Sequence, residues 1–453
     1  MKIIIIGAGE VGFHIAGRLA LENKDVVVID QNSEALRRIS DAIDVQVLKG
    51  SGSSPVMLEE AGVREAEIVL ALTDSDETNL VACLVADILS PVTKKLARIR
   101  NSDFDEYHER FKEFAPHIDT VINPEIEVVK TIERLLSVPG AVDIGEFADG
   151  RMKFIGIRLD ENARLAGIRL SEIPKKLGRR TLIAAVIRNE ELIIPRGSDR
   201  LLANDLIYFI SETKNVDEML SAFDKQARPL RRVLIVGGGR IGYRLASFLE
   251  EKSIYTKIIE KNPERCSQLA ESMKKTVILC GDGSDQSLML EENIADMDAV
   301  VTLTDDEETN ILVSLLARRM GVRDIITKIS KFSYFPLMSM IGIEQVVSPR
   351  LSAINTILQH IRKGKVLSAI SIKGEEAEVL EAIALPTSDI VGKPLKNLSF
   401  PKGALLIGII HNDEVIIPSG ESIIEPDDRI IIFARKEAVQ QIEKILTVKL
   451  EFF

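Results

Sequence analysis

The chain has 453 residues, of which 45% are hydrophobic, and it carries a formal net charge of −11 at pH 7. This length is enough for about three or four domains, and the negative charge provides no general basic field that would attract nucleic acid or anionic lipid. Its apolar runs are far shorter than the roughly 20 residues that a membrane-spanning helix needs, so we expect none of them to cross a bilayer.

The first predicted element is a strand from Lys2 to Ile6 that leads into Gly7-Ala8-Gly9-Glu10-Val11-Gly12 and a helix, and the next strand, Val26 to Ile29, ends at Asp30. In this pattern the first glycine permits a tight turn, the second lets the backbone approach a pyrophosphate, and the third lets helix and strand pack closely. Backbone N–H groups and the positive helix end then hold the phosphates. An acidic residue at position 30 accepts both ribose hydroxyls and repels a 2′-phosphate, which favours NAD over NADP.

Further polar residues follow the next strands of this unit. The strand Val45 to Leu48 leads into Lys49-Gly50-Ser51-Gly52-Ser53, a later apolar strand leads into Thr73-Asp74, and the strand Leu96 to Ile99 carries Arg98. Ligands of doubly wound sheets bind at the carboxyl ends of the strands, so these residues are expected at a ligand-binding rim. A Thr-Asp pair ahead of a helix is also an ordinary N-cap, and Arg98 is equally compatible with a solvated edge charge.

A smaller unit comes next, after a helix that starts at Asn123-Pro124. The apolar runs Leu182 to Arg188 and Leu192 to Pro195 flank the polar turn Asn189-Glu190-Glu191, and a further strand begins at Asp205. Two apolar runs around a short polar turn predict a β-hairpin. The unit is therefore interpreted as a small strand-rich domain with flanking helices, which Gln226 to Pro229 link to the rest of the chain.

The second half of the chain repeats this order. The strand Arg232 to Val236 leads into Gly237-Gly238-Gly239-Arg240-Ile241-Gly242, which begins 230 positions after the first glycine motif, and Glu260 follows the next strand. The other counterparts are Gly281, Asp282, Thr304, Asp305 and Lys328, a helix start at Ser348-Pro349, the hairpin around Asn412-Asp413-Glu414, and a strand beginning at Asp428. One GxGxxG motif can be a tight turn that binds nothing, whereas two copies in matched strand and helix contexts favour nucleotide binding.

The predicted fold is therefore α/β, with two Rossmann-like doubly wound parallel sheets, each followed by a small α+β domain. The boundaries are 1–137 and 230–364 for the Rossmann-like domains, and 138–226 and 365–453 for the small ones. The apolar face of the second connecting helix, Leu351, Ile354, Leu358 and Ile361, is interpreted as core packing, with contact between neighbouring modules as the alternative.

Other chemistry is poorly supported by the sequence. The cysteines, Cys83, Cys266 and Cys280, lack CxxC spacing, which fits a reducing compartment, and the five histidines lack metal-ligand spacing. The basic pairs Lys94-Lys95 and Arg179-Arg180 are interpreted as solvated surface. The chain begins directly with a core strand, so a cytoplasmic location is expected. No partnered histidine, lysine or cysteine recurs beside the glycine loops, so we predict no catalytic residues and no metal site.

This organisation resembles the RCK (regulator of potassium conductance) proteins, and within them the double-module regulatory subunits of bacterial and archaeal Trk potassium uptake systems. The resemblance spans essentially the whole chain and rests on the two glycine motifs, the loops at Gly50 and Gly281, the paired Leu-Thr-Asp segments, and the duplicated Ile-Pro sequences at Ile194-Pro195 and Ile417-Pro418. It implies a gating subunit that forms a ring, expected to be a homotetramer, and sits peripherally on the inner face of a membrane potassium translocator. It also implies binding of NAD(H) and adenine nucleotides.

Transferred to this chain, the resemblance places nucleotide contacts in both modules. In the first they are Gly7, Gly9, Glu10, Val11, Gly12, Asp30, Gly50, Thr73, Asp74 and Arg98, and in the second Gly237, Gly239, Arg240, Ile241, Gly242, Glu260, Asp282, Thr304, Asp305 and Lys328.

The two glycine loops differ in one charge. Arg240 in the second loop can bind an additional phosphate, whereas Glu10 in the first would repel one. We therefore predict NAD or NADH in module one and ATP or ADP in module two. Ser51 stands where the second copy has Asp282, which removes one expected polar contact from the first site.

Two alternatives remain at this point. One is an NAD-dependent oxidoreductase with duplicated Rossmann domains, and the other is a redox- or energy-sensing module with a different partner. Only the family resemblance selects potassium transport over the latter.

Overall fold

A computed structural model of the chain describes residues 1–107, 110–114, 116–177, 181–225, 229–361, 366–372 and 376–446. By their internal contacts the residues fall into two compact units, 1–127 with 349–361, and 128–348 with 362–453. The predicted linker Gln226 to Pro229 lies, except for Pro229, outside the described residues, and so does the whole of the basic pair Arg179-Arg180. The domain boundaries given above stay a prediction.

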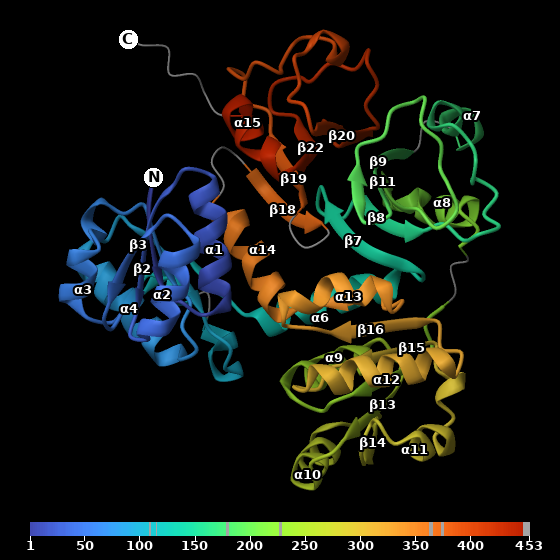
Figure 1. Ribbon diagram of the computed structural model, residues 1–453, viewed down its shortest axis with the longest axis horizontal. Coiled ribbons are helices and arrows are strands. Elements are labelled where there is room, and N and C mark those ends of the chain that lie inside the picture. The colour runs from blue at the N-terminus through green and yellow to red at the C-terminus, as the bar shows by residue number, and fades with distance from the viewer. Residues whose placement is uncertain are drawn as a thin grey trace. The chain divides into compact units, whose positions relative to one another are not determined.

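The first unit contains a doubly wound sheet of parallel strands, of which β2 and β3 are labelled in Figure 1. The strand order is β3-β2-β1-β4-β5-β6. The strands are β1 (Lys2–Ile6), β2 (Asp25–Asp30), β3 (Gln46–Lys49), β4 (Ile68–Ala71), β5 (Lys94–Arg98) and β6 (Thr120–Ile122). The helices include α1 (Glu10–Leu21), α2 (Ser33–Ala42), α3 (Pro55–Glu60), α4 (Asp76–Leu89) and α5 (Arg110–Glu113). The strand order reverses between β1 and β4, so the carboxyl ends of these strands frame the ligand crevice expected of such folds.

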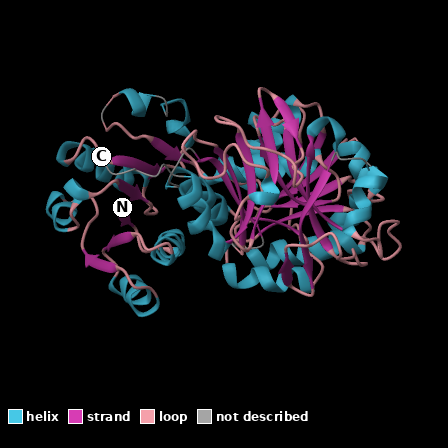
Figure 2. Cartoon of the chain, turned by 90° about the horizontal axis from the view of Figure 1, so that it is seen from above, coloured by secondary structure: helices cyan, strands magenta, loops and turns pink. Residues whose placement is uncertain are grey.

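The sequence of β1 explains its central position. Ile3, Ile4 and Ile5 are all fully buried, which requires cover on both faces of the sheet, and Figure 2 shows helices flanking the strands. One interpretation from the sequence is wrong here. Lys95, assigned to solvated surface, is 1% exposed on β5, and its Nζ lies 2.7 Å from Asp87 Oδ1 because a buried charge needs an opposite partner.

Helix α14 (Pro349–Ile361) belongs to the first unit, although the chain enters it from the second parallel sheet. It packs against α1, and its predicted apolar face buries Ile354, Leu358 and Ile361. Helix α6 (Pro124–Ser137) starts at its predicted proline and crosses the unit boundary. From Val128 onward its buried side chains share a core with the second parallel sheet.

The second unit holds the matching parallel sheet, in the order β14-β13-β12-β15-β16-β17. Its strands are β12 (Arg232–Val236), β13 (Tyr255–Glu260), β14 (Val277–Cys280), β15 (Ala299–Thr302), β16 (Asp324–Lys328) and β17 (Gln345–Val347). Its helices are α9 (Arg240–Glu251), α10 (Pro263–Ser272), α11 (Gln286–Glu291), α12 (Glu307–Arg319) and α13 (Phe335–Met340). The predicted duplication of the Rossmann-like fold is thereby confirmed.

Two antiparallel sheets complete the second unit, in the orders β10-β9-β11-β8-β7 and β18-β19-β22-β20-β21. The first small domain comprises β7 (Ala141–Phe147), β8 (Met152–Arg158), α7 (Ile173–Leu177), β9 (Thr181–Arg188), β10 (Glu191–Ile193), β11 (Leu206–Glu212) and α8 (Val216–Ala222). The second comprises β18 (Val366–Ile372), β19 (Ala377–Ile383), β20 (Ala404–His411), β21 (Glu414–Ile416), β22 (Arg429–Arg435) and α15 (Lys436–Leu446).

The predicted hairpins are confirmed, and their turns explain the residue types. Asn189 and Glu190 between β9 and β10, and Asn412 and Asp413 between β20 and β21, all have positive φ, which asparagine and aspartate tolerate best among non-glycine residues. The two small domains share one core, in which the rings of Phe154 and Phe433 stack with centroids 6.2 Å apart. None of the helices in the described residues has the length and apolar character needed to cross a bilayer.

Candidate nucleotide-binding sites

The two glycine loops have the same geometry, and it requires glycine at two positions of each loop. Gly7 and Gly237 have φ of +113° and +109°. A Cβ on Gly12 would lie 1.9 Å from the Gly7 carbonyl oxygen, and one on Gly242 would lie 2.1 Å from that of Gly237. The first glycine of each loop therefore makes the turn, and the third permits contact between helix and turn.

The second glycine of each loop faces open space. A Cβ built on Gly9 or Gly239 meets nothing within 4 Å, and both residues have ordinary extended backbone conformations as N-caps of α1 and α9. Glycine is therefore not required there by the fold itself. The space in front of the two helix N-termini is available to a ligand that approaches the backbone, as a pyrophosphate does.

The acidic residue at the end of each second strand is anchored to its glycine loop. Asp30 Oδ2 accepts the Ala8 N–H at 2.6 Å, and Oδ1 accepts the Asn32 N–H at 2.8 Å. In the second module, Glu260 accepts from Gly238 at 2.7 Å and from Asn262 at 2.8 Å. Each carboxylate is thus fixed at the crevice, and its remaining lone pairs can accept from a hydroxyl group.

A buried asparagine holds each Thr-Asp segment, and the sequence had given it no role. Asn79 Oδ1 accepts from the Thr73 N–H and Oγ1 at 2.9 and 2.7 Å, while its Nδ2 donates to the carbonyl oxygens of Thr73 and Arg98. Asn310 makes the same four bonds with Thr304 and Lys328. Both asparagines are fully buried. The recurrence of Thr78-Asn79 as Thr309-Asn310 in the two halves of the sequence is a signal that could have found them.

The N-cap alternative for the Thr-Asp pairs is wrong in register. The capping side chains are those of Ser75, which accepts the Thr78 N–H, and Asp306, which accepts the Thr309 N–H. Thr73 and Asp74 therefore precede the cap on the rim.

The strand cations contact the rim carboxylates of their own modules. Arg98 Nη1 lies 2.9 Å from Asp74 Oδ1, and Lys328 Nζ lies 2.9 Å from Asp305 Oδ1. Arg100 adds a hydrogen bond to the Asp74 carbonyl oxygen. In each module the structure thus pairs two residues that the sequence had placed on the rim. Arg98 and Lys328 are therefore more than solvated edge charges.

The loops after β3 and β14 differ between the modules. Ser51 Oγ contacts Ser53 Oγ at 2.8 Å, whereas Asp282 accepts from the Ser284 hydroxyl and backbone N–H and lies 2.9 Å from Lys261 Nζ. The hydrogen bond from Ser284, followed by that from Lys261, lowers the pKa of Asp282. Gly50 hydrogen bonds to the Asp30 carbonyl oxygen at 3.0 Å, which ties the first loop to the crevice.

These residues of the first module surround one cavity of about 600 Å³. Its lining includes Gly7, Gly9, Glu10, Val11, Asp30, Gly50, Thr73, Asp74 and Arg98, and also Arg100 and Arg350, which the sequence had not indicated. Val11 and its counterpart Ile241 are only 5% and 7% exposed, so they serve mainly as core side chains. Arg240, in contrast, is exposed at the start of α9.

Glu10 is not an isolated negative charge. Its Oε1 lies 2.6 Å from Arg38 Nη1, and its Oε2 lies 3.9 Å from Arg350 Nη1. Although burial raises the pKa of Glu10, the hydrogen bond and charge of Arg38, together with the charge of Arg350, hold it below its usual value. The expected repulsion of a phosphate by Glu10 is therefore offset by neighbouring arginines.

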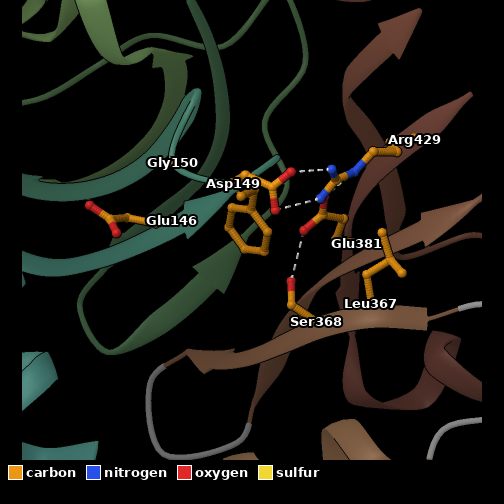
Figure 3. Close-up of a pocket in the computed structure, with 8 residues that line it drawn as sticks. Glu146, Asp149, Gly150, Leu367, Ser368, Glu381 and Arg429 are labelled. Carbon is orange, nitrogen blue, oxygen red and sulfur yellow. Dashed lines mark hydrogen bonds and ion pairs between the residues drawn. The ribbon is translucent and has the colours of Figure 1, made fainter. Parts of the chain in front are cut away.

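A second cavity, of about 440 Å³, lies where the two small domains of the second unit meet (Figure 3). Arg429 dominates it, with Nη1 2.6 Å from Asp149 Oδ2 and Nη2 2.6 Å from Glu381 Oε1. Glu381 also accepts from the Ser368 hydroxyl and the Ala148 N–H. The arginine thus links two sheets, and no sequence motif had pointed to this cluster.

No cluster of three or more potential metal-ligating side chains occurs in the part of the chain that the structure describes.

His411 and Arg188 occupy matching positions in the small domains, each beside a buried aspartate. His411 Nδ1 lies 2.6 Å from Asp428 Oδ1, and Arg188 Nη2 lies 2.7 Å from Asp205 Oδ2. The hydrogen bond to Asp428, and then its negative charge, raise the pKa of His411 above 6.5. The charged imidazole therefore stabilises the fold fully below pH 6.5, and this contribution is lost as the pH rises through the raised pKa.

We therefore expect the urea midpoint of the second unit to fall as the pH rises above about 6.5. Replacing His411 by Arg, the residue type of the first small domain, should remove this part of the pH dependence because guanidinium stays charged. Urea unfolding of wild type and His411→Arg across a pH series measures the difference, with His117→Asn in the first unit as control. Equal pH dependence of wild type and His411→Arg would contradict the prediction.

Fold and site together define a double-module protein with two Rossmann-like lobes, each followed by a small antiparallel domain. The TrkA-N domain model matches residues 3–124 and 233–349, and the TrkA-C domain model matches 154–224 and 379–447. The chain therefore belongs to the TrkA family, within the RCK proteins that its sequence resembles.

Similar proteins span the full length of the chain. The "Trk system potassium uptake protein TrkA homolog 2" of Methanosarcina mazei is 38% identical over 98% of this chain and 100% of the relative. TrkA of Halomonas elongata is 36% identical, with 100% of both chains covered. Among solved structures, the GsuK RCK domain covers 98% of this chain and 94% of its own at 18% identity, with a TM-score of 0.60. The "GsuK channel bound to NAD" covers 98% of this chain and 78% of its own at 19% identity, also with a TM-score of 0.60. These structures share the fold.

Proposed function

We propose that the chain is the nucleotide-binding regulatory subunit of a Trk-type potassium uptake system. The observation that carries this proposal is the duplicated crevice, in which open space over Gly9 or Gly239 adjoins an anchored Asp30 or Glu260, in a chain of the TrkA family. Its full-length relatives are named as Trk system potassium uptake proteins. The partner is accordingly a membrane potassium translocator of the Trk type.

In each crevice the nucleotide phosphates bind at the N-terminus of α1 or α9, where backbone N–H groups and the helix dipole favour anions. The adenosine ribose binds at Asp30 or Glu260. The rim segments Thr73-Asp74 and Thr304-Asp305, with Arg98 and Lys328, bind the other end of the ligand. The geometry common to both modules supports this arrangement, because the same four-bond asparagine scaffold fixes each rim.

The two sites take different nucleotides, NAD or NADH in the first and ATP or ADP in the second. Asp30 and the cavity of about 600 Å³ support a dinucleotide in the first site. Arg240 supports a terminal phosphate in the second, because guanidinium binds phosphate oxygens bidentately. Asp282, which pairs with Lys261, is proposed to contact the ribose of the nucleotide in the second site.

The proposal is tested by calorimetric titration of ligand-stripped protein with NADH, NAD, ATP and ADP. We expect Arg240→Ala to weaken ATP or ADP binding by about 10- to 100-fold, the effect of one charge-assisted hydrogen-bonding group, without changing NADH binding. Arg244→Ala, on the same helix, controls for loss of charge. Potassium uptake by cells that depend on the variant should then lose its response to adenine nucleotides. Failure of all four nucleotides to bind the wild type would refute the proposed function.

Regulation of potassium uptake requires that the subunits assemble and that the assembly contacts the translocator. The chain is proposed to form a homotetrameric ring on the inner face of the membrane, held there by its translocator. Val81, Leu84 and Ile88 lie on α4 at helical spacing and are 45%, 38% and 71% exposed, which supports self-association through this face. Shifting a conformational equilibrium from 1:99 to 99:1 takes about 5.5 kcal/mol of differential binding, and several sites in one ring can add their contributions.

The alternative of an NAD-dependent oxidoreductase predicts turnover of NADH with a metabolite. Among the described residues, the lining of the first cavity includes no histidine, lysine or cysteine, which supports a binding role over proton transfer. Steady consumption of NADH by the purified protein would favour the enzyme. A sensor with a different partner is distinguished by the absence of any effect on potassium uptake.

A further inference from the structure

Arg350 lines the first nucleotide cavity, although the chain reaches it from the second module. It is the second residue of α14, which packs against α1 in the first unit. Strand β17 of the second parallel sheet ends at Val347, and α14 begins at Pro349, so Ser348 alone separates them. Any group that binds Arg350 therefore contacts a helix directly tethered to the second Rossmann-like sheet.

The position of Arg350 suits it to bind a phosphate. Its Nη1 lies 3.9 Å from Glu10 Oε2, at the N-terminus of α1, beside the open space over Gly9. A guanidinium matches the geometry of phosphate oxygens and can bind them bidentately. Glu10 is itself held more closely by Arg38, at 2.6 Å.

The positions of Glu10 and Arg350 have counterparts in the other repeat, and there the acidic and the basic residue are exchanged. Glu10 in the first glycine loop corresponds to Arg240 in the second, and Arg350, which follows Ser348-Pro349, corresponds to Glu125, which follows Asn123-Pro124. The first loop thus lacks the arginine that the second has, and the helix arriving at the first crevice carries one. Each loop residue is matched by a helix residue of opposite sign.

We infer that Arg350 binds the phosphates of the nucleotide in the first site, in the role proposed for Arg240 in the second, so that the second module contributes to the site of the first. The inference rests on the proposed function. Its ligand chemistry is a pyrophosphate or polyphosphate, carried by NAD(H) or by ATP and ADP. Nucleotide binding at the first site then holds α14 against α1, and α14 is joined through Ser348 to strand β17 of the second parallel sheet.

The experiment uses full-length Gly239→Val, in which the second site is blocked and the first is measured alone. Calorimetry with NADH, NAD, ATP and ADP compares this protein with its Arg350→Ala and Arg350→Lys derivatives. We expect Arg350→Ala to weaken binding of the preferred nucleotide by about 10- to 100-fold and Arg350→Lys to recover part of the loss. Arg37→Ala removes the same charge from an exposed position on α2, where Arg37 pairs with Asp41, and should leave the affinity unchanged.

A second comparison separates ligand binding from simple neutralisation of Glu10. If Arg350 binds phosphate, Arg350→Ala weakens binding in the Glu10→Gln background as well. If it serves only to offset the Glu10 charge, its loss has no effect in that background, which would overturn the inference. Equal affinity of Gly239→Val with and without Arg350 would also overturn it while leaving the proposed function standing. If Gly239→Val binds none of the four nucleotides although its melting temperature matches the wild type, the inference and the first-site proposal fail together.

Discussion

Gly9→Val is expected to abolish nucleotide binding at the first site, with a loss of affinity of at least about 100-fold, while the protein folds normally. A Cβ at this position meets no atom within 4 Å, and the backbone conformation, with φ of −67°, suits any residue. The valine side chain would therefore occupy the space in which a pyrophosphate approaches the α1 N-terminus. Two or more charge-assisted hydrogen bonds, each contributing about 1.5–3 kcal/mol, would be lost.

Calorimetry with NADH and urea unfolding of the same preparation test both parts of this expectation. Gly12→Ala is the matched control, because its Cβ would lie 1.9 Å from the Gly7 carbonyl oxygen. Overpacking of this kind destabilises by about 1–3 kcal/mol or more, so the control should fail in the unfolding assay first. Wild-type NADH affinity in Gly9→Val would show that the crevice over Gly9 is not the phosphate site.

The glycine loops were predictable because they are constrained locally. A tight turn requires positive φ at Gly7 and Gly237, and the helix contact leaves no room for a side chain at Gly12 and Gly242. Short-range steric constraints therefore determine the motif. Asp30 and Glu260 were predictable for a related reason, since each ends a strand adjacent to the loop. The parallel strand order then follows from alternation of apolar strands and helices, and the family resemblance extends it to the whole chain.

The missed features depend on partners that are distant in the sequence. Arg350 reaches the first cavity only because α14 packs against α1. No local sequence pattern indicates that this helix, which follows the second parallel sheet, packs in the first unit. The sequence assigns Lys95 to a basic surface pair, whereas in the structure its Nζ lies 2.7 Å from Asp87 Oδ1. The Arg429 cluster similarly requires the two small sheets to meet before Asp149 becomes its partner. No spacing rule identifies such tertiary pairs in a single sequence.

The second large effect is expected from Asn79, the buried side chain that holds the Thr73-Asp74 segment. Asn79→Ala should lower the free energy of unfolding of the first unit by about 3 kcal/mol, because removing a buried hydrogen-bonding side chain leaves each lost partner with a desolvation cost of roughly 1–3 kcal/mol. Asn79 is fully buried, and its amide bonds the Thr73 N–H, hydroxyl and carbonyl groups and the Arg98 carbonyl oxygen. No neighbouring side chain is required to move for alanine to fit.

The same substitution should weaken nucleotide binding at the first site and spare the second, because only Thr73-Asp74 loses its anchor, while Asn310 still holds Thr304. Urea unfolding and calorimetry in the Gly239→Val and Gly9→Val backgrounds measure these two consequences. Asn101→Ala is the matched control. Asn101 is exposed, and its Oδ1 accepts a single backbone N–H, from Asp103, so its loss should cost about 1 kcal/mol or less. Equal destabilisation by the two alanine variants would mean that burial of Asn79 adds nothing. An unchanged nucleotide affinity in Asn79→Ala would instead remove the Thr-Asp rim from the site.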